Sequence, residues 1–162
     1  MIMRIVLALL TFTSALFFFT GCTVALPFKK STLFNPSDTS NAVAVVGLTH
    51  VTLGDDAEKN SLFWKNTFAV LDDLPNRPGY LGHGVRVKIF GGEAWTMTVW
   101  ADQESLKAFV RSEKHQTAMQ QGIAALKNAR FAQFEMKLPE VPMSWKQAEE
   151  VLAKSGRDLR PK

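Results

Sequence analysis

Residues 80–100 read YLGHGVRVKIFGGEAWTMTVW and decide the fold, because two alternating segments surround a glycine pair. The first segment runs from Tyr80 to Phe90. One of its faces holds His83, Val85, Val87 and Ile89, and the other holds Gly82, Gly84, Arg86 and Lys88. Gly91-Gly92 is a hairpin turn signal, and Ala94 to Trp100 returns with the same period. The spacing predicts an antiparallel β-hairpin.

Upstream of the hairpin, the sequence predicts a strand and a helix. Val43 to Leu53 is β-branched and alternating, with apolar side chains on both faces. It predicts a strand that is at least partly covered on both sides. The Asp55-Asp56 pair follows Gly54 and is well placed to cap and charge the start of a helix. Apolar residues then recur at helical spacing until Pro75.

Downstream of the hairpin, Asp102 and Ser112 are predicted N-caps of two consecutive helical segments. In the second piece, one helical face is shared by His115, Met119, Gly122 and Leu126. Arg130 to Leu138 alternates again and predicts a fourth strand. Ser144 then caps a last predicted helix, Trp145 to Lys154.

The order is β-α-β-β-α-β plus a terminal helix, which predicts a ferredoxin-like α+β domain over residues 42–156. A charged tail, residues 157–162, would follow. Both crossover helices of this fold lie on one face of an antiparallel sheet. Because the strands carry apolar residues on both faces, a face-to-face homodimer is the simplest way to cover the other face.

The beginning of the 162-residue chain differs from the domain, because Ile5 to Phe28 holds 24 uncharged residues and 5 of the 12 Phe. A basic start, the apolar run Ile5 to Phe19 and a small-residue exit are typical of a secretory signal. Gly21-Cys22 resembles the end of a bacterial lipoprotein signal, in which the Cys is lipidated, although Phe19 departs from the usual Leu. We expect a signal over residues 1–22, a tether over 23–41 and a location in the bacterial cell envelope.

Two other interpretations of the leader stay open. As an uncleaved helix, its 24 uncharged residues would span about 36 Å, enough for a bilayer. The positive-inside rule weakens this anchor, because Lys29 and Lys30 beyond it carry more charge than Arg4 before it. A plain signal cleaved near Gly21 would leave Cys22 as an exposed thiol.

Composition excludes several classes of site. Cys22 is the sole cysteine, so a lipidated form leaves no thiol for zinc, an iron-sulfur cluster or a nucleophile. The net charge of +4 is spread without a dense Lys/Arg block, so we expect no nucleic-acid binding. Three scattered His argue against a metal site, and we expect no cofactor.

Three short motifs occur at defined places relative to the predicted strands and helices. They are Pro78-Gly79-Tyr80 before the second strand, Trp100-Ala101-Asp102 after the third, and Ser112-Glu113-Lys114-His115 within the second helical region. Together they resemble the antibiotic-biosynthesis-monooxygenase-like family of dimeric α+β barrels, over roughly Val43 to Leu138. The resemblance implies a domain of that fold. Some members oxygenate electron-rich aromatic compounds without metal or flavin, some degrade haem, and many have no known activity.

The haem-degrading branch is matched only in part. Its ring-facing Trp corresponds to Trp100, but its Asn and its axial His fall at Thr49 and Met119. These departures weaken haem degradation, although His115, one turn earlier, could approach a ligand.

The candidate site follows from the resemblance and the predicted faces. His115 is the best catalytic base, Trp100 shapes the pocket, and the pocket lining is completed by His50, Phe109 and Met119. Simpler interpretations are that His115 packs at the Ser112 turn, that Trp100 fills the core and that His50 lies at a dimer seam. We expect a membrane-tethered, cofactor-independent monooxygenase for a small hydrophobic or aromatic compound. The alternative is a non-catalytic lipoprotein that binds a small ligand or partner, with haem binding third.

Overall fold

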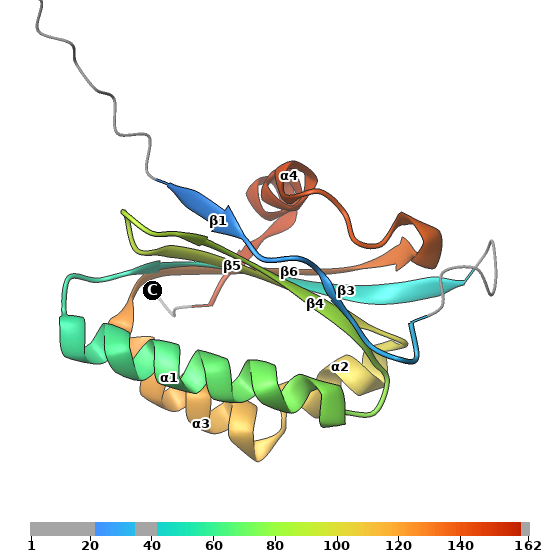
Figure 1. Cartoon of the computed structure of the whole chain (residues 1–162), viewed down its shortest axis with the longest axis horizontal. Helices are drawn as coiled ribbons and strands as arrows, with labels where there is room; N and C mark the ends of the chain where they lie inside the picture. The colour runs from blue at the N-terminus through green and yellow to red at the C-terminus, as the bar shows by residue number, and fades with distance from the viewer. Residues whose placement is uncertain (1–21, 35–41, 160–162) are drawn as a thin grey trace, which may run out of the picture.

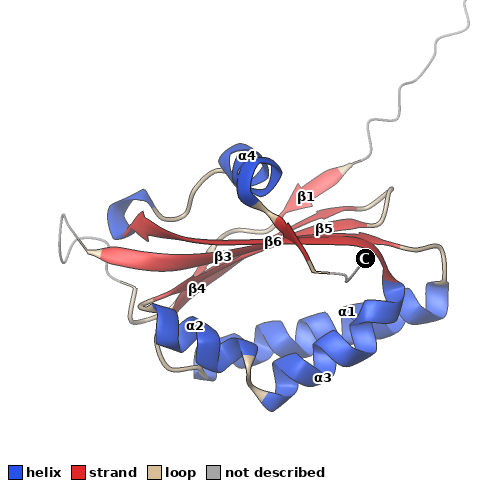
Figure 2. Ribbon diagram, turned by 180° about the vertical axis from the view of Figure 1, so that it is seen from behind, coloured by secondary structure: helices blue, strands red, loops and turns tan. Residues whose placement is uncertain are grey.

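The computed structural model describes residues 22–34 and 42–159. These residues form three layers around a seven-stranded antiparallel sheet (Figure 1). Helices α1, α2 and α3 lie on one face of the sheet, and α4 lies on the other (Figure 2).

The four central strands have the predicted ferredoxin-like topology. They are β3 (Val43–Leu53), β4 (Tyr80–Lys88), β5 (Glu93–Trp100) and β6 (Leu126–Lys137). Their order across the sheet is β4-β5-β3-β6. The predicted hairpin turn is present, and Gly91 and Gly92 take φ angles of 134° and 63°, which glycine adopts without steric cost. The α+β fold class predicted from sequence is therefore confirmed.

The helices begin where the sequence places their caps. They are α1 (Ala57–Asp73), α2 (Gln103–Val110), α3 (Glu113–Gly122) and α4 (Trp145–Ser155), with single 3₁₀ turns at Leu74–Asn76, Ile123–Ala125 and Leu138–Glu140. The side chains of Asp56, Asp102, Ser112 and Ser144 each accept a hydrogen bond from a backbone N–H of the first turn. These bonds satisfy donors that a helix start leaves unpaired.

One predicted boundary is wrong. Strand β6 begins at Leu126, four residues before the predicted Arg130, so Leu126 does not share a helical face with His115. The helix ends at Gly122, and a 3₁₀ turn leads directly into the strand. The Ala-Ala pair before Leu126 carries no stop signal, so helical spacing alone extended the predicted helix to this residue.

Residues 22–34 form an N-terminal strap along the outer edge of β4. Strands β1 (Thr23–Ala25) and β2 (Lys29–Lys30) both pair antiparallel with β4. The sequence assigned these residues to a tether over 23–41, but residues 23–34 belong to the folded unit, and 35–41 lie outside the described residues. Likewise β7 (Arg157–Asp158), from the predicted tail, pairs with β6.

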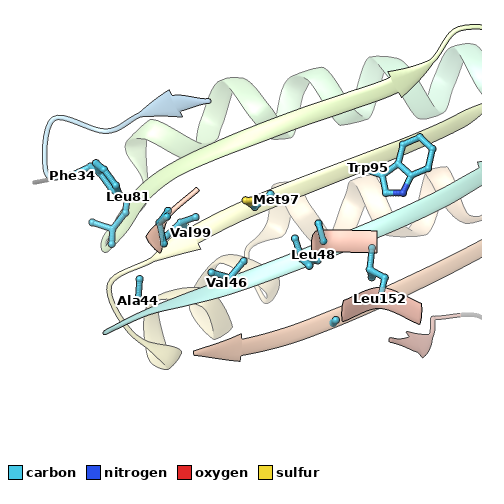
Figure 3. Packing of buried hydrophobic residues seen from close by; sticks show 12 residues of the cluster. Phe34, Ala44, Val46, Leu48, Leu81, Trp95, Met97, Val99 and Leu152 are labelled. Atoms are coloured by element: carbon cyan, nitrogen blue, oxygen red, sulfur yellow. The ribbon is translucent and has the colours of Figure 1, made fainter. Parts of the chain in front are cut away.

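The sheet face under α4 holds the main hydrophobic core (Figure 3). Its buried members are Phe34, Ala44, Val46, Leu48, Leu81, Trp95, Met97, Val99, Ala132, Val141, Ala148 and Leu152. The sequence predicts that a second copy of the chain covers this face. In the structure α4 covers it together with Phe28 and Phe34 of the strap, so the face needs no second copy to be buried. The homodimer itself stays a prediction.

The opposite face contacts its helices mainly at two ends. Next to α2 the buried residues are Val45, Leu74, Tyr80, Trp100, Leu106 and Phe109, and at the far end they are Val51, Leu53, Ala94, Ala125, Leu126 and Ala129. Between these clusters the sheet presents half-buried Thr49, Thr96, Thr98 and Gln133. Helix α1 contributes no fully buried residue. The helix layer is therefore loosely seated over the middle of the sheet.

Candidate functional site

Three of the predicted site residues meet at the α2 end of the helix-facing side. Trp100, at the end of β5, stacks on Phe109 of α2 with ring centroids 4.9 Å apart. Phe109 in turn contacts the imidazole of His115 on α3, edge to face at 4.7 Å. The break between α2 and α3 at Ser112 turns both side chains toward each other.

Sequence reasoning missed two further members of this cluster. Tyr80 lies against Trp100, with centroids 5.9 Å apart, and its hydroxyl is 2.6 Å from Nδ1 of His83. Simple alternation places residues 80 and 83 on opposite faces of a strand. A register shift between Tyr80 and Gly82 brings both to the helix-facing side. No sequence signal marks this bulge.

We call the resulting row of side chains the aromatic line. It consists, in spatial order, of His83, Tyr80, Trp100, Phe109 and His115. Three aromatic rings separate its two imidazoles. The line thus has a polar group at each end and an apolar middle.

At the first end, Tyr80 and His83 are held in defined protonation states. Burial raises the pKa of Tyr80 to about 12, so the phenol is protonated at neutral pH. Burial, with the nearby charge of Lys29, lowers the pKa of His83, so its imidazole is neutral. The hydroxyl also lies 3.4 Å from the carbonyl oxygen of Lys29, to which it can donate. In the tautomer of His83 with its proton on Nε2, the phenol donates to Nδ1 and His83 presents an N–H donor.

At the other end, His115 presents a hydrogen-bond acceptor. Its Nδ1 is 3.1 Å from the carbonyl oxygen of Val110, to which it donates, so the lone pair is on Nε2. Burial lowers the pKa of His115, although the Val110 carbonyl opposes the shift. A neutral imidazole with a free lone pair is competent as a general base. The same contacts are those expected of a side chain that packs at the helix break.

Trp100 is 0% exposed, and its indole N–H has no hydrogen-bond partner among the described residues. A buried donor without a partner costs free energy. The ring is held instead by the aromatic contacts on its two sides.

A pocket of about 400 Å³ adjoins the His83 end of the line. It is lined by Leu26, Pro27, Phe28, Lys29, His83 and Val85. The strap leaves the edge of β4 between its two short strands, and this detour makes the pocket. The walls are mostly apolar, with the imidazole of His83 among them. Neither Trp100 nor His115 lines this pocket.

A second hollow, of about 510 Å³, lies between α1 and α3. Arg77 and Lys114 line it, and both bind the carboxylate of Asp73. Burial raises the pKa of Asp73, but these two hydrogen bonds outweigh it and the pKa is lowered. No residue of the aromatic line borders this hollow.

Two predicted pocket residues lie elsewhere. His50 stacks on Trp95 at 4.5 Å, and its Nε2 is 3.1 Å from Glu93. Trp95 belongs to the α4 face, so His50 does not share a pocket with His115, and its assignment to that pocket is wrong. His50 lies on the sheet face for which the alternative proposed a dimer seam, and that seam stays a prediction. Met119 is 36% exposed on α3, outside the aromatic line.

The described residues contain neither a candidate metal cluster nor a membrane-spanning helix. In residues 22–34 and 42–159, no three His, Cys, Asp or Glu side chains come together as candidate metal ligands. No helix in these ranges is long and apolar enough to cross a membrane. The predicted signal lies outside the described residues, except for Cys22, which is exposed at its end.

No protein-family model and no curated protein matches this sequence. Solved structures do match in fold. A Nitrosomonas europaea protein assigned as an antibiotic biosynthesis monooxygenase aligns with a TM-score of 0.52 over 65% of this chain and 98% of its own, at 8% identity. A Pseudomonas aeruginosa protein aligns with a TM-score of 0.52 over 58% of this chain and 94% of its own, at 13% identity.

A third match is larger than this chain. A Lactobacillus acidophilus protein assigned as a monooxygenase aligns with a TM-score of 0.52 over 65% of this chain, at 15% identity. This chain covers only 46% of that protein. At these identities the matches show the fold, and they confirm the fold that the sequence motifs implied.

Proposed function

We propose that this protein is a membrane-tethered, cofactor-independent monooxygenase that acts on a small hydrophobic or aromatic compound. The observation that carries the proposal is the aromatic line, whose apolar middle separates a hydrogen-bond donor at His83 from a base at His115. Monooxygenase assignments of the Nitrosomonas and Lactobacillus proteins support this reaction class.

The chemistry requires only groups that the chain supplies. A base removes a proton from an acidic C–H of a phenolic substrate of the anthrone type, and the resulting carbanion reduces dioxygen. One oxygen atom becomes the new carbonyl oxygen, and the other leaves as water. The substrate CH₂ supplies all four electrons, so no external reductant is needed. Apolar walls around the reacting carbon would protect the carbanion from water.

Each end of the aromatic line suits one part of this task. His115 accepts the proton, because its Nε2 lone pair is free and its lowered pKa keeps it neutral. His83 lines an apolar pocket and, in its Nε2–H tautomer, is suited to donate to a carbonyl or phenolic oxygen. Variants at the two ends distinguish these two roles.

Oxygen consumption tests the proposal. The full-length protein is assayed with a panel of anthrone-type phenols and hydroquinones, and compared with His115→Ala and His83→Ala. His50→Ala is the matched control, because this imidazole lies on the other face of the sheet. We expect a loss of about 10²-fold or more at His115, the usual contribution of a general base, and wild-type rates for the control. Equal rates in all four proteins would exclude catalysis at the aromatic line.

A non-catalytic binding protein is the second candidate, and one observation favours it. The 400 Å³ pocket touches His83 but neither of the predicted catalytic residues, Trp100 and His115. A binding protein would show saturable ligand binding that His83→Ala weakens, without oxygen uptake. Titration with the same panel of phenols, followed by tryptophan fluorescence, measures this binding.

The tether is part of the proposal and has its own test. Cys22 is exposed and immediately precedes β1, so an acyl chain on its sulfur would not disturb the fold. The mass of membrane-extracted protein should correspond to a chain that begins at an acylated Cys22, and Cys22→Ala should abolish this species. An intact Met1 would favour the helical anchor.

A further inference from the structure

We propose that the domain lies against the membrane through an apolar patch beside Cys22. This membrane patch consists of Val24, Leu26, Ile89 and Phe90. The inference rests on the membrane tether proposed above and adds an orientation to it. Of its four residues, Leu26 also lines the His83 pocket, and the other three do not.

The four side chains are exposed although they are apolar. Phe90, in the turn between β4 and β5, is 71% exposed, and Ile89 beside it is 57% exposed. Val24 and Leu26 lie on the same face of the strap, because they are two residues apart in extended chain. Exposed apolar side chains scattered singly need no explanation, but a contiguous group marks an interaction surface.

The patch is continuous with the end of the leader. The amide of Ile89 donates to the carbonyl oxygen of Cys22 at 3.0 Å. Val24 pairs with Val87, one step further along the same two strands. Figure 1 shows the start of β1 beside the β4–β5 turn, at the left of the view. The membrane patch therefore lies beside the residue at which the leader ends.

This position identifies a lipid surface as the partner. Acyl chains on Cys22 and an uncleaved apolar helix both bring the bilayer to this residue. An extended chain rises about 3.3 Å per residue, so Val24 and Leu26 lie within roughly 7 and 13 Å of Cys22 along the strap. A lipid anchor this short holds the patch at the headgroup level, where apolar side chains gain from burial.

The charges around the patch do not oppose such contact. Lys29 and Lys30 are exposed on the strap and suit anionic headgroups. Asp55 and Asp56, at the nearby start of α1, each form an ion pair with a lysine. The turn itself, residues 89–92, carries no charge.

Fluorescent labels on the full-length protein test the proposal. The acylated protein is reconstituted in vesicles of phosphatidylcholine and phosphatidylglycerol, with a polarity-sensitive label on Phe90→Cys. Acylation consumes the only native thiol, so the new cysteine is labelled alone. Glu104→Cys is the matched control, because it is exposed at the start of α2, at the opposite end of the domain (Figure 1). If the intact leader is retained, both labels are placed in a Cys22→Ala background.

We expect blue-shifted emission from the label at residue 90 and at least threefold stronger quenching by spin-labelled lipids than at residue 104. Equal quenching at the two positions, in protein that floats with the vesicles, overturns the membrane patch and leaves the tether intact. Protein that does not float refutes the tether and the patch together. Oxygen uptake is measured on the same samples, so failure of the proposed reaction is scored separately.

Discussion

The two faces of the sheet are packed to different degrees. Under α4, the side chains of Leu48, Val99 and Ala148 are completely buried. On the other face, α1 has no fully buried residue, and the middle of the sheet is lined by half-buried threonines. The closely packed layer is thus formed by α4 and the strap, which lie outside the βαββαβ unit. The crossover helix α1 packs less closely on its face of the sheet.

The largest expected effect contrasts two neighbours on β3 that point to opposite faces. Leu48→Ala should lower the free energy of unfolding by about 2–5 kcal/mol, because it opens a cavity in the close-packed α4 face. Thr49→Ala should cost less than about 1 kcal/mol, because its surroundings are already loose. Urea unfolding measures both. Equal costs would show that the two faces are packed alike.

The next prediction concerns how the strap closes the α4 face. A Cβ at Gly82 would lie 2.5 Å from the ring of Phe28 and 2.9 Å from the carbonyl oxygen of Lys29. Gly82→Ala should therefore cost about 1–3 kcal/mol by overpacking and detach the strap. The amides of Leu26 and Ser31, which bond to β4, should then exchange hydrogen faster.

Gly84→Ala is the matched control for this prediction. Its added Cβ would meet Trp145 at 3.3 Å and Phe28 at 3.5 Å, contacts that side-chain shifts can relieve. We expect a smaller loss of stability and unchanged exchange at Leu26. If Gly84→Ala also released the strap, Phe28 would not be the residue that holds it.

A smaller loss in the free energy of unfolding should come from His83, on the helix-facing side, as the pH falls. The pKa of His83 is lowered in the folded protein, so the unfolded chain takes up a proton near pH 6.5 that the folded chain resists. Stability from this group is fully present above about pH 6.5 and falls below it. His83→Gln should make this decline shallower, although the lowered pKa of His115 acts in the same direction. An unchanged pH profile would contradict the burial of His83.

Sequence patterns predicted the βαββαβ unit well, because strand alternation, helical spacing and helix caps are local features. Strand β3 has the predicted bounds, and the caps at Asp102 and Ser112 divide the second helical region as expected. The strap was missed because its pairing with β4 joins residues more than 50 positions apart and shows no period. The Tyr80–His83 contact was missed because a bulge reverses the alternation.

The candidate site was predicted in part for the same reason. The helical register and the cap at Ser112 bring His115 toward Phe109, and strand alternation places Trp100 beneath them. His50 was misplaced because β3 carries apolar side chains on both faces. Its alternation alone gives no indication of which face meets the helices.

The smallest expected loss of stability is at the edge of the α4 face, where the guanidinium of Arg86 packs on two aromatic rings. The guanidinium of Arg86 lies 4.0 Å from the ring centroid of Trp95 and 5.4 Å from that of Trp145, and it also binds Glu149. Arg86→Lys should cost about 0.5–1 kcal/mol, because an ammonium does not stack on two rings as a planar guanidinium does.

Double-mutant cycles separate the two kinds of contact at Arg86. Its coupling energy with Trp145→Leu should be about 0.5–1 kcal/mol, since the stacked ring is partly buried. Its coupling with Glu149→Gln should be near zero, because the Glu149 side chain is 48% exposed and water screens the pair. The reverse order would mean that an ion pair, rather than aromatic packing, joins α4 to the edge of the sheet. The α4 face would then owe less of its rigidity to close packing than its buried side chains suggest.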